Sequence, residues 1–135
     1  MSLALFKALA VLSVDPGCLG DRLTSRAEIA STMPHYILYI EPDLSKDDQD
    51  KLQKRLSPIF DIALREVHAP YDRQRSNCRI GEAQVKILIP GAFLALKSLL
   101  VSIGKSSASK VPSVIKSQRQ INLLEVYIQM YPIKN

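Results

Sequence analysis

Two apolar segments separated by an amphipathic one constrain the fold of this 135-residue chain most strongly. HYILYIE at 35–41 and AQVKILIP at 83–90 are rich in β-branched and aromatic residues, which is typical of strands. Between them, segment 45–67 repeats its apolar residues at four- and three-residue steps, which predicts a helix with one apolar face. Because such a crossover joins parallel strands, we expect 36–41 and 84–90 to pair in parallel.

The helix at 45–67 has a clear beginning and a possible break. Ser45 and Asp48 have the spacing of a capping pair, and the acids near this end suit the positive helix N-terminus. Pro58 lies inside the pattern, where it removes a backbone donor and clashes with the carbonyl of Lys54. We therefore expect a kink, or a second helix that begins with Ser57 as its cap.

The other segments complete a small α+β domain. Apolar spacing predicts helices at 3–13 and 92–103, and alternation in INLLEVYIQMY predicts a strand at 121–131. A weak helix is expected at 21–31, a long polar loop at 68–82, a flexible basic linker at 104–111 and a short helix from Pro112 to about 119. The whole chain, 1–135, is expected to be one compact domain. Its small mixed sheet would have three to four strands, and a fourth could lie in 9–14 or 75–82.

The net charge of +5 is concentrated in one third of the sequence. Segment 83–124 contains six cations and no acid, whereas the preceding residues are nearly neutral. Such asymmetry favours a polyanionic partner. We therefore expect a non-enzymatic module that binds a polyanion, most plausibly RNA or DNA, through 97–119. The candidate anion-binding residues are Lys97, Lys105, Lys110, Lys116 and Arg119, joined by Arg73, Arg75 and Arg79 if the long loop folds nearby. A solvated basic face that only aids solubility is the alternative.

The Gly104-Lys105-Ser106 run does not predict a nucleotide-binding loop. Such a loop needs a second glycine five residues earlier, where this sequence has Leu99. The run also follows a helix end, whereas phosphate binds at a helix N-terminus.

No pattern in the sequence predicts catalysis, a cofactor or a metal. The two histidines and two cysteines are scattered, so no metal-ligand pair and no nucleophile–base pair is recognisable. Without an evident signal peptide, Cys18 and Cys78 are expected to be reduced thiols in an intracellular, reducing compartment such as the cytoplasm or nucleus. A disulfide between them remains open.

A second hypothesis is a protein-interaction or self-assembly domain that would form a homo-oligomer. Leu123, Tyr127 and Tyr131 would lie together on the outer face of the expected C-terminal strand. The apolar helix at 3–13 is too short to span a membrane, so no transmembrane segment is expected. With the basic region it could give a peripheral, matrix-like membrane contact.

Overall fold

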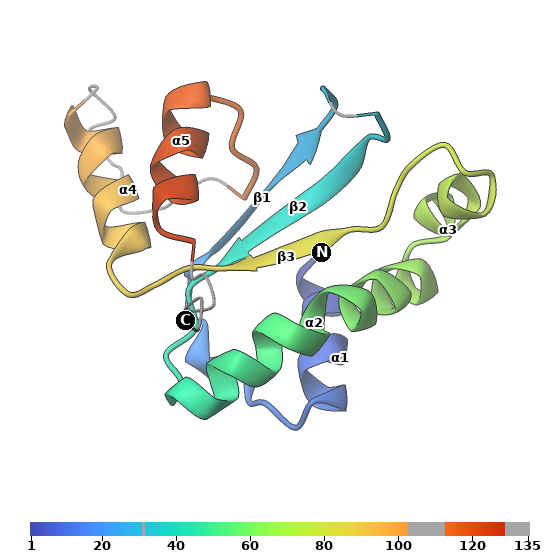
Figure 1. Ribbon diagram of the computed structural model, residues 1–135, viewed down its shortest axis with the longest axis horizontal. Coiled ribbons are helices and arrows are strands. Elements are labelled where there is room, and N and C mark those ends of the chain that lie inside the picture. The colour runs from blue at the N-terminus through green and yellow to red at the C-terminus, as the bar shows by residue number, and fades with distance from the viewer. Residues whose placement is uncertain (31, 103–112, 129–135) are drawn as a thin grey trace, which may run out of the picture.

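The computed structural model describes residues 1–30, 32–102 and 113–128. In these residues the chain forms a three-stranded mixed sheet with five α-helices, which confirms the α+β class and a small sheet (Figure 1). The elements, in chain order, are α1 (Ser2–Val11), the 3-10 helix η1 (Pro16–Cys18), β1 (Leu23–Glu28), β2 (His35–Ile40), α2 (Lys46–Val67), α3 (Ala69–Ser76), β3 (Gln84–Ile87), α4 (Ala92–Ser102) and α5 (Gln118–Val126).

The sheet has the order β1-β2-β3, with β2 in the centre. β1 and β2 are antiparallel, whereas β2 and β3 are parallel, as the crossover through α2 predicts. The outer side of β1 is partly paired as well: the Ser25 amide donates to the Ser113 carbonyl at 3.1 Å and the Ile115 amide to the Ser25 carbonyl at 2.9 Å.

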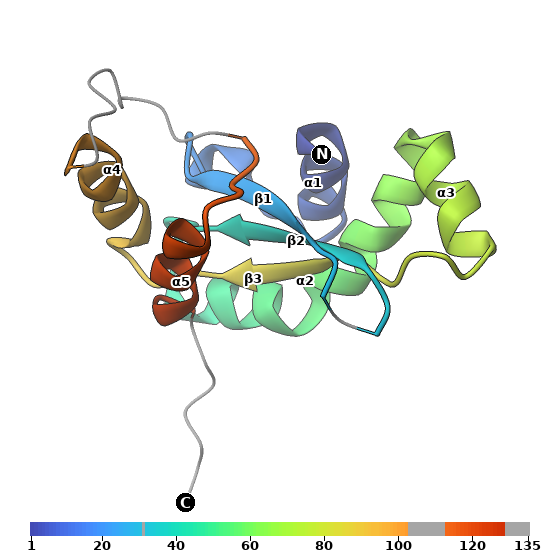
Figure 2. The ribbon, with the colours of Figure 1, turned by 90° about the horizontal axis from the view of Figure 1, so that it is seen from above.

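Helices cover the two faces of the sheet unequally (Figures 1 and 2). Leu38 and Ile40 of β2 pack with α1 and α2 in one hydrophobic cluster. Ile37 and Tyr39, which alternate with them, pack with α4 and α5 in a second cluster on the opposite face. In both views α4 and α5 lie near one end of the sheet and α3 lies at the other end. The face that carries α4 and α5 is therefore only partly covered by these two helices.

Helix α2 continues through Pro58 as one helix, so the second helix expected from Ser57 is absent. Ser45 caps its N-terminus by accepting a hydrogen bond from the Asp48 amide, as predicted. Ser57 has a different partner from the one expected: its hydroxyl accepts from the Val85 amide at 2.9 Å and donates to the Val85 carbonyl at 3.3 Å. The completely buried side chains of Leu56 and Phe60 hold the helix on the sheet on both sides of the proline.

A buried carboxylate of α2 connects this helix to α3 and to Ala83, the residue before β3. Asp61 of α2 is 3% exposed and accepts hydrogen bonds from the Tyr71 hydroxyl, the Arg75 guanidinium and the Ala83 amide. Burial alone would raise the pKa of Asp61, but the hydrogen bonds from Arg75, Tyr71 and Ala83 outweigh it and hold that pKa below its ordinary value. The segment expected to be a long loop thus contains a fixed helix.

Another carboxylate, that of Glu41, caps the N-terminus of α4. Glu41, directly after β2, accepts from the Phe93 amide at 2.8 Å and the Gly91 amide at 3.1 Å, which are unpaired donors at the helix N-terminus. Gly91 has a φ of +99°, a conformation that glycine adopts without strain. This turn directs the chain from the end of β3 onto the second face of the sheet.

Three expected elements have the wrong type. Residues 113–117, expected in a short helix, are not helical, and Val114 forms an isolated β-bridge with Ser25. Residues 21–31 contain β1 instead of a helix, because pairing with β2 buries Thr24 and Ser25 and overrides a weak local preference. Segment 121–131 lies mostly in α5 instead of a strand, as far as it is described, with Gln120 and Leu124 on the buried side. A short apolar run fits both the helical and the strand period, and tertiary packing decides between them. The expected linker at 104–111 lies outside the described residues.

Candidate functional site

A charged cluster lies where α5 meets the partly covered face of the sheet. Arg26, Tyr39 and Lys86 come from β1, β2 and β3, and Glu125 comes from α5. Tyr39 pairs in register with Lys86, so their side chains emerge on the same face. The register of β1 and β2 places Arg26 opposite Ile37, on this face too. We call these four residues the sheet-face cluster.

The hydrogen bonds of the sheet-face cluster are almost all internal. Arg26 Nε donates to the Tyr39 hydroxyl oxygen at 2.9 Å, and that hydroxyl donates to Glu125. Lys86 Nζ donates to both Glu125 carboxylate oxygens, at 3.1 and 3.2 Å. A further carboxylate, Glu28, accepts from Arg26 Nη1 at 3.0 Å.

Two cations and two carboxylates therefore compensate one another at this place. Burial, together with the hydrogen bond donated to Glu125, raises the pKa of Tyr39 well above its ordinary value, so this hydroxyl keeps its proton. Burial by itself would lower the pKa of Arg26. Its hydrogen bonds to Tyr39 and Glu28 outweigh this effect and raise the pKa above its ordinary value, so the guanidinium remains charged. The cluster holds α5 on the sheet and presents a polar surface, but it offers neither a free base nor a nucleophile.

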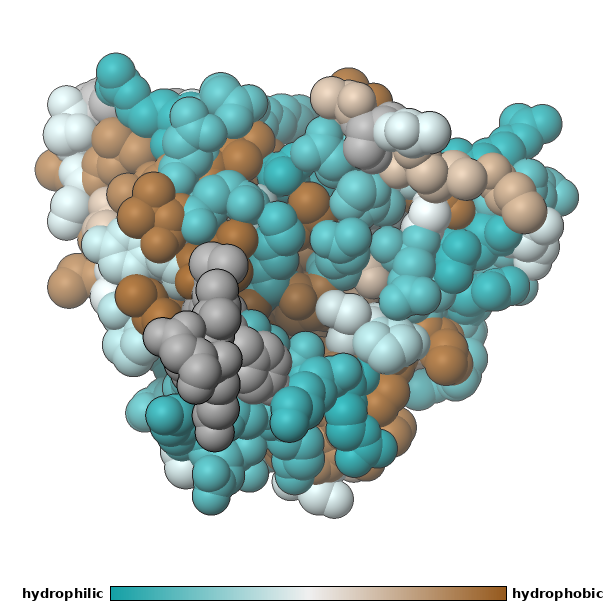
Figure 3. All heavy atoms as spheres, in the orientation of Figure 1, coloured by the Kyte–Doolittle hydropathy of each residue, from teal (hydrophilic) through white to brown (hydrophobic). Residues whose placement is uncertain are grey.

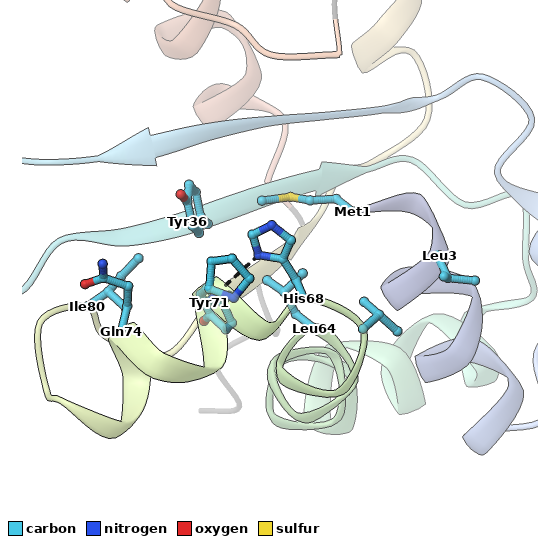
Figure 4. Close-up of a pocket in the computed structure, with 10 residues that line it drawn as sticks. Met1, Leu3, Tyr36, Leu64, His68, Tyr71, Gln74 and Ile80 are labelled. Atoms are coloured by element: carbon cyan, nitrogen blue, oxygen red, sulfur yellow. Dashed lines mark hydrogen bonds between the residues drawn. The ribbon is translucent and has the colours of Figure 1, made fainter.

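A pocket of about 530 Å³ lies on the other side of the sheet, between the start of α1 and the α2–α3 corner (Figure 4). We call it the α3 pocket. Its wall is mainly apolar, and the apolar lining residues include Leu3, Leu64, Val67, Pro70 and Ile80. Two aromatic rings, Tyr36 of β2 and Tyr71 of α3, complete the wall with centroids 5.9 Å apart.

Polar groups lie at the same pocket. His68 ends α2 and caps α3, because its Nδ1 accepts a hydrogen bond from the Tyr71 amide at 3.3 Å. Gln74 lies one turn further along α3. The lining residues that are described include no carboxylate and no lysine or arginine side chain.

The predicted anion-binding residues do not converge. Lys97 forms an ion pair with Asp21 at 3.4 Å, and Arg75 is bound to the buried Asp61. The other described candidates are exposed, with Lys116 and Arg119 at α5 and Arg73 and Arg79 at or near α3. Since α3 and α5 lie at opposite ends of the sheet in both views, these cations form two separate groups (Figures 1 and 2). Lys105 and Lys110 lie outside the described residues.

The predicted interface residues do not form a strand surface either. Leu123 and Tyr127 are partly buried against the second hydrophobic cluster, and Tyr131 lies outside the described residues. On the face shown in Figure 3, hydrophobic side chains gather instead over α4 and α5. The most exposed large ones on these helices are Leu94 and Val126, which are 71% and 79% exposed.

The described residues carry neither a metal-binding cluster nor a membrane-spanning helix. Among the described residues, no three or more His, Cys, Asp or Glu side chains come close enough to hold a metal ion. No helix in the described part of the chain is both long and apolar enough to cross a bilayer. Cys18 and Cys78 are both free thiols.

The sequence does not predict the sheet-face cluster, because its patterns indicate the wrong type for two of the contributing elements. Arg26 lies in a segment whose pattern favours a helix and Glu125 in a segment whose pattern favours a strand, so their proximity does not follow from the sequence. One signal was present in the sequence: Tyr39 lies in a strand with two apolar faces, and a buried tyrosine hydroxyl needs a hydrogen-bond partner.

Known proteins resemble this chain in sequence, and two solved structures also share its fold. The mouse (Mus musculus) GH3 domain-containing protein is 29% identical over 118 residues, which are 83% of this chain and 20% of the mouse protein. The solved GH3.15 acyl acid amido synthetase superposes with a TM-score of 0.73 at 27% identity, over 94% of this chain and 24% of the synthetase. The same synthetase type in complex with 2,4-DB gives a TM-score of 0.73 at 25% identity, over 94% of this chain and 23% of that one. The chain therefore spans about a fifth to a quarter of these relatives.

These similarities overturn the expected function. The hypothesis of a nucleic-acid-binding module is wrong, because the similar proteins are synthetases and a GH3 domain-containing protein. The expectation of a non-enzymatic module is not confirmed either, since this domain type belongs to an enzyme family. The model of the GH3 family C-terminal domain matches residues 7–119, which is most of the sequence, and the chain thus belongs to the GH3 family as a C-terminal domain.

Proposed function

We propose that this chain acts as the C-terminal domain of an amide-forming enzyme of the acyl acid amido synthetase type. The observation that carries the proposal is the correspondence with the GH3.15 acyl acid amido synthetase over 94% of this chain. An enzyme of this name joins the carboxyl group of an acyl acid to a nitrogen. A carboxylate is unreactive toward amines, so such an enzyme must activate it and then shield the activated acid from water.

The chemistry of the described residues favours a supporting role for this domain. The acids and bases of the sheet-face cluster are already paired with one another, so the groups that activate the acid are expected in the rest of the enzyme. What the domain offers is a stable polar surface. Parallel strands are usually covered on both faces, yet α4 and α5 cover only one end of this face of the parallel pair β2–β3. We assign the remaining part, around Glu28, His35 and Gln84, to contact with the larger part of the enzyme.

The test is a chimera in which this chain replaces the matching quarter of the GH3.15 acyl acid amido synthetase. Amide formation from that synthetase's own acyl acid is measured for the chimera, for the intact synthetase and for a form that ends before the replaced domain. We expect the chimera to form amide faster than the truncated form. A chimera that is folded by circular dichroism but no more active than the truncated form would refute the proposal.

Paired variants of the chimera test the assigned surface. Gln84→Lys places a charge on the open sheet face, whereas Asn77→Lys makes a similar change at the exposed end of α3. We expect only Gln84→Lys to reduce amide formation, by about tenfold if the added charge is desolvated at the contact. Equal activities of the two variants would contradict contact through this face.

A further inference from the structure

The α3 pocket has the size and lining of a small-molecule site. Its volume of about 530 Å³ lies within the range of known ligand pockets, about 300–1,000 Å³. Such pockets are lined mainly by apolar and aromatic side chains with a few polar groups, and this composition is found here. The pocket contacts α1, α2 and α3, on the opposite side of the sheet from α5 and the sheet-face cluster.

The polar groups at the pocket determine which ligand it fits. Because Nδ1 of His68 accepts the Tyr71 amide hydrogen, the neutral ring carries its proton on Nε2 and can donate it to a ligand. Among the described residues, the Tyr36 hydroxyl and the Gln74 amide group have no hydrogen-bond partner, so both are available as donors. No carboxylate among the described lining residues would repel an oxygen-rich group.

We propose that the α3 pocket binds a compact apolar molecule that ends in a carbonyl or carboxylate oxygen. The apolar body would lie against Leu64, Val67 and Ile80 and against the wall that the neighbouring rings of Tyr36 and Tyr71 form together. Figure 4 shows the pocket and its lining side chains. Its terminal oxygen would accept hydrogen bonds from His68 Nε2 and the Gln74 amide. This site is separate from the surface assigned above to the rest of the enzyme, so either proposal can fail while the other holds.

Occupancy can be read directly in the 135-residue chain, because it contains no tryptophan and five tyrosines. Two of them, Tyr36 and Tyr71, line the pocket, so tyrosine fluorescence reports a bound ligand without tryptophan background. The probes are 4-cyclohexylbutanoate and its amide, 4-cyclohexylbutanamide, which share one apolar body and differ in the terminal group. We expect a saturable fluorescence change with at least one probe. The absence of a saturable change with both probes would overturn the proposal.

A filling variant and its control locate the binding. Val67→Phe adds volume to the pocket wall, whereas Ile62→Phe makes a similar change on α2 at a 57% exposed position outside the α3 pocket. We expect Val67→Phe to weaken probe binding at least about tenfold and Ile62→Phe to leave it unchanged. Equal effects of the two variants would contradict binding in this pocket.

Sedimentation at the same protein concentrations tests whether a second copy of the chain occupies the pocket. A dimer that the probes dissociate would overturn the proposal.

Two further variants test the polar end of the site. Gln74→Glu places a carboxylate at the pocket, so it should weaken the butanoate about tenfold and the butanamide much less. His68→Asn keeps a side-chain acceptor that can cap α3 but removes the ring, so both probes should bind more weakly while helix content is retained. Unchanged binding of both probes by both variants would show that these groups do not contact the ligand and would refute the assigned polar end.

Discussion

Replacement of Asp61 by asparagine should destabilise the domain far more than the same replacement at the neighbouring acid Asp72. Asp61 is 3% exposed and accepts hydrogen bonds from Tyr71, Arg75 and the Ala83 amide. Asparagine has nearly the same shape, but it is uncharged and has one acceptor oxygen in place of two. The variant therefore leaves the Arg75 guanidinium without its counter-charge.

The magnitude follows from the burial of the two partners. Removal of one member of a buried ion pair costs about 3–5 kcal/mol. The Arg75 side chain is 20% exposed, so water partly compensates it, and we expect a loss of about 2–3 kcal/mol. Asp72 instead pairs with Arg65 at the surface, where the two side chains are 47% and 35% exposed. Asp72→Asn should therefore cost less than about 1 kcal/mol.

Urea unfolding of the three proteins, followed by circular dichroism, measures these differences. With a slope of about 2 kcal/mol per molar urea, Asp61→Asn should lower the midpoint by about 1–1.5 M. Because the pKa of Asp61 is lowered in the folded state, its stabilisation is present above the unfolded-state pKa of about 4 and is lost as the pH falls through the folded value. The difference from wild type should consequently shrink below about pH 4. Equal midpoints for Asp61→Asn and Asp72→Asn at neutral pH would refute the reasoning.

Three further predictions concern a cap, the tyrosines and the thiols. Glu41→Ala removes the acceptor for two amides at the start of α4 and should cost about 1–2 kcal/mol in urea unfolding, and a change below about 0.3 kcal/mol would contradict the capping role. Burial and hydrogen bonds to carboxylates raise the pKa of Tyr39 and Tyr71, so spectrophotometric titration should find at least two tyrosines still protonated at about pH 11. Because only the unfolded chain releases these protons near pH 10, stability should fall as the pH rises above about 10, and a flat profile there would contradict the shifts. Cys78 is exposed, whereas burial raises the pKa of the partly buried Cys18, so a thiol reagent at neutral pH should modify Cys78 first, as peptide mapping would show.

The sequence predicts the fold best where its signals are long and consistent. The parallel pair β2–β3 and the crossover helix α2 follow from apolar strands and a helical stripe several turns long. The Ser45 cap follows from its spacing to Asp48. These local preferences agree with the tertiary structure, so they could be inferred without it.

The sequence fails where contacts distant along the chain decide the structure. β1 has few strand-forming residues and is a strand because it pairs with β2 and with Ser113 and Ile115. In the helix α5, Glu125 accepts a hydrogen bond from the Tyr39 hydroxyl of the sheet. No local sequence pattern could indicate this contact. For the same reason, the number of cations in a segment is a poor measure of how basic the folded surface is. Lys97 and Arg75 form ion pairs with acids from other parts of the sequence.

The pairing of Ser25 with Ser113 also has a consequence for the order of folding. The two residues are 88 positions apart, so this pairing closes a long loop, and loop closure of that length is slow and entropically costly. The α4–α5 layer packs on Ile37 and Tyr39 of the sheet, so it can be completed only after β1 and β2 are in place. We therefore expect the α4–α5 layer to form late in folding and to open first in the native state. The backbone amides of α5 should then exchange hydrogen before those of β2. Exchange of both elements at one common rate would instead mean that the domain opens only as a single cooperative unit.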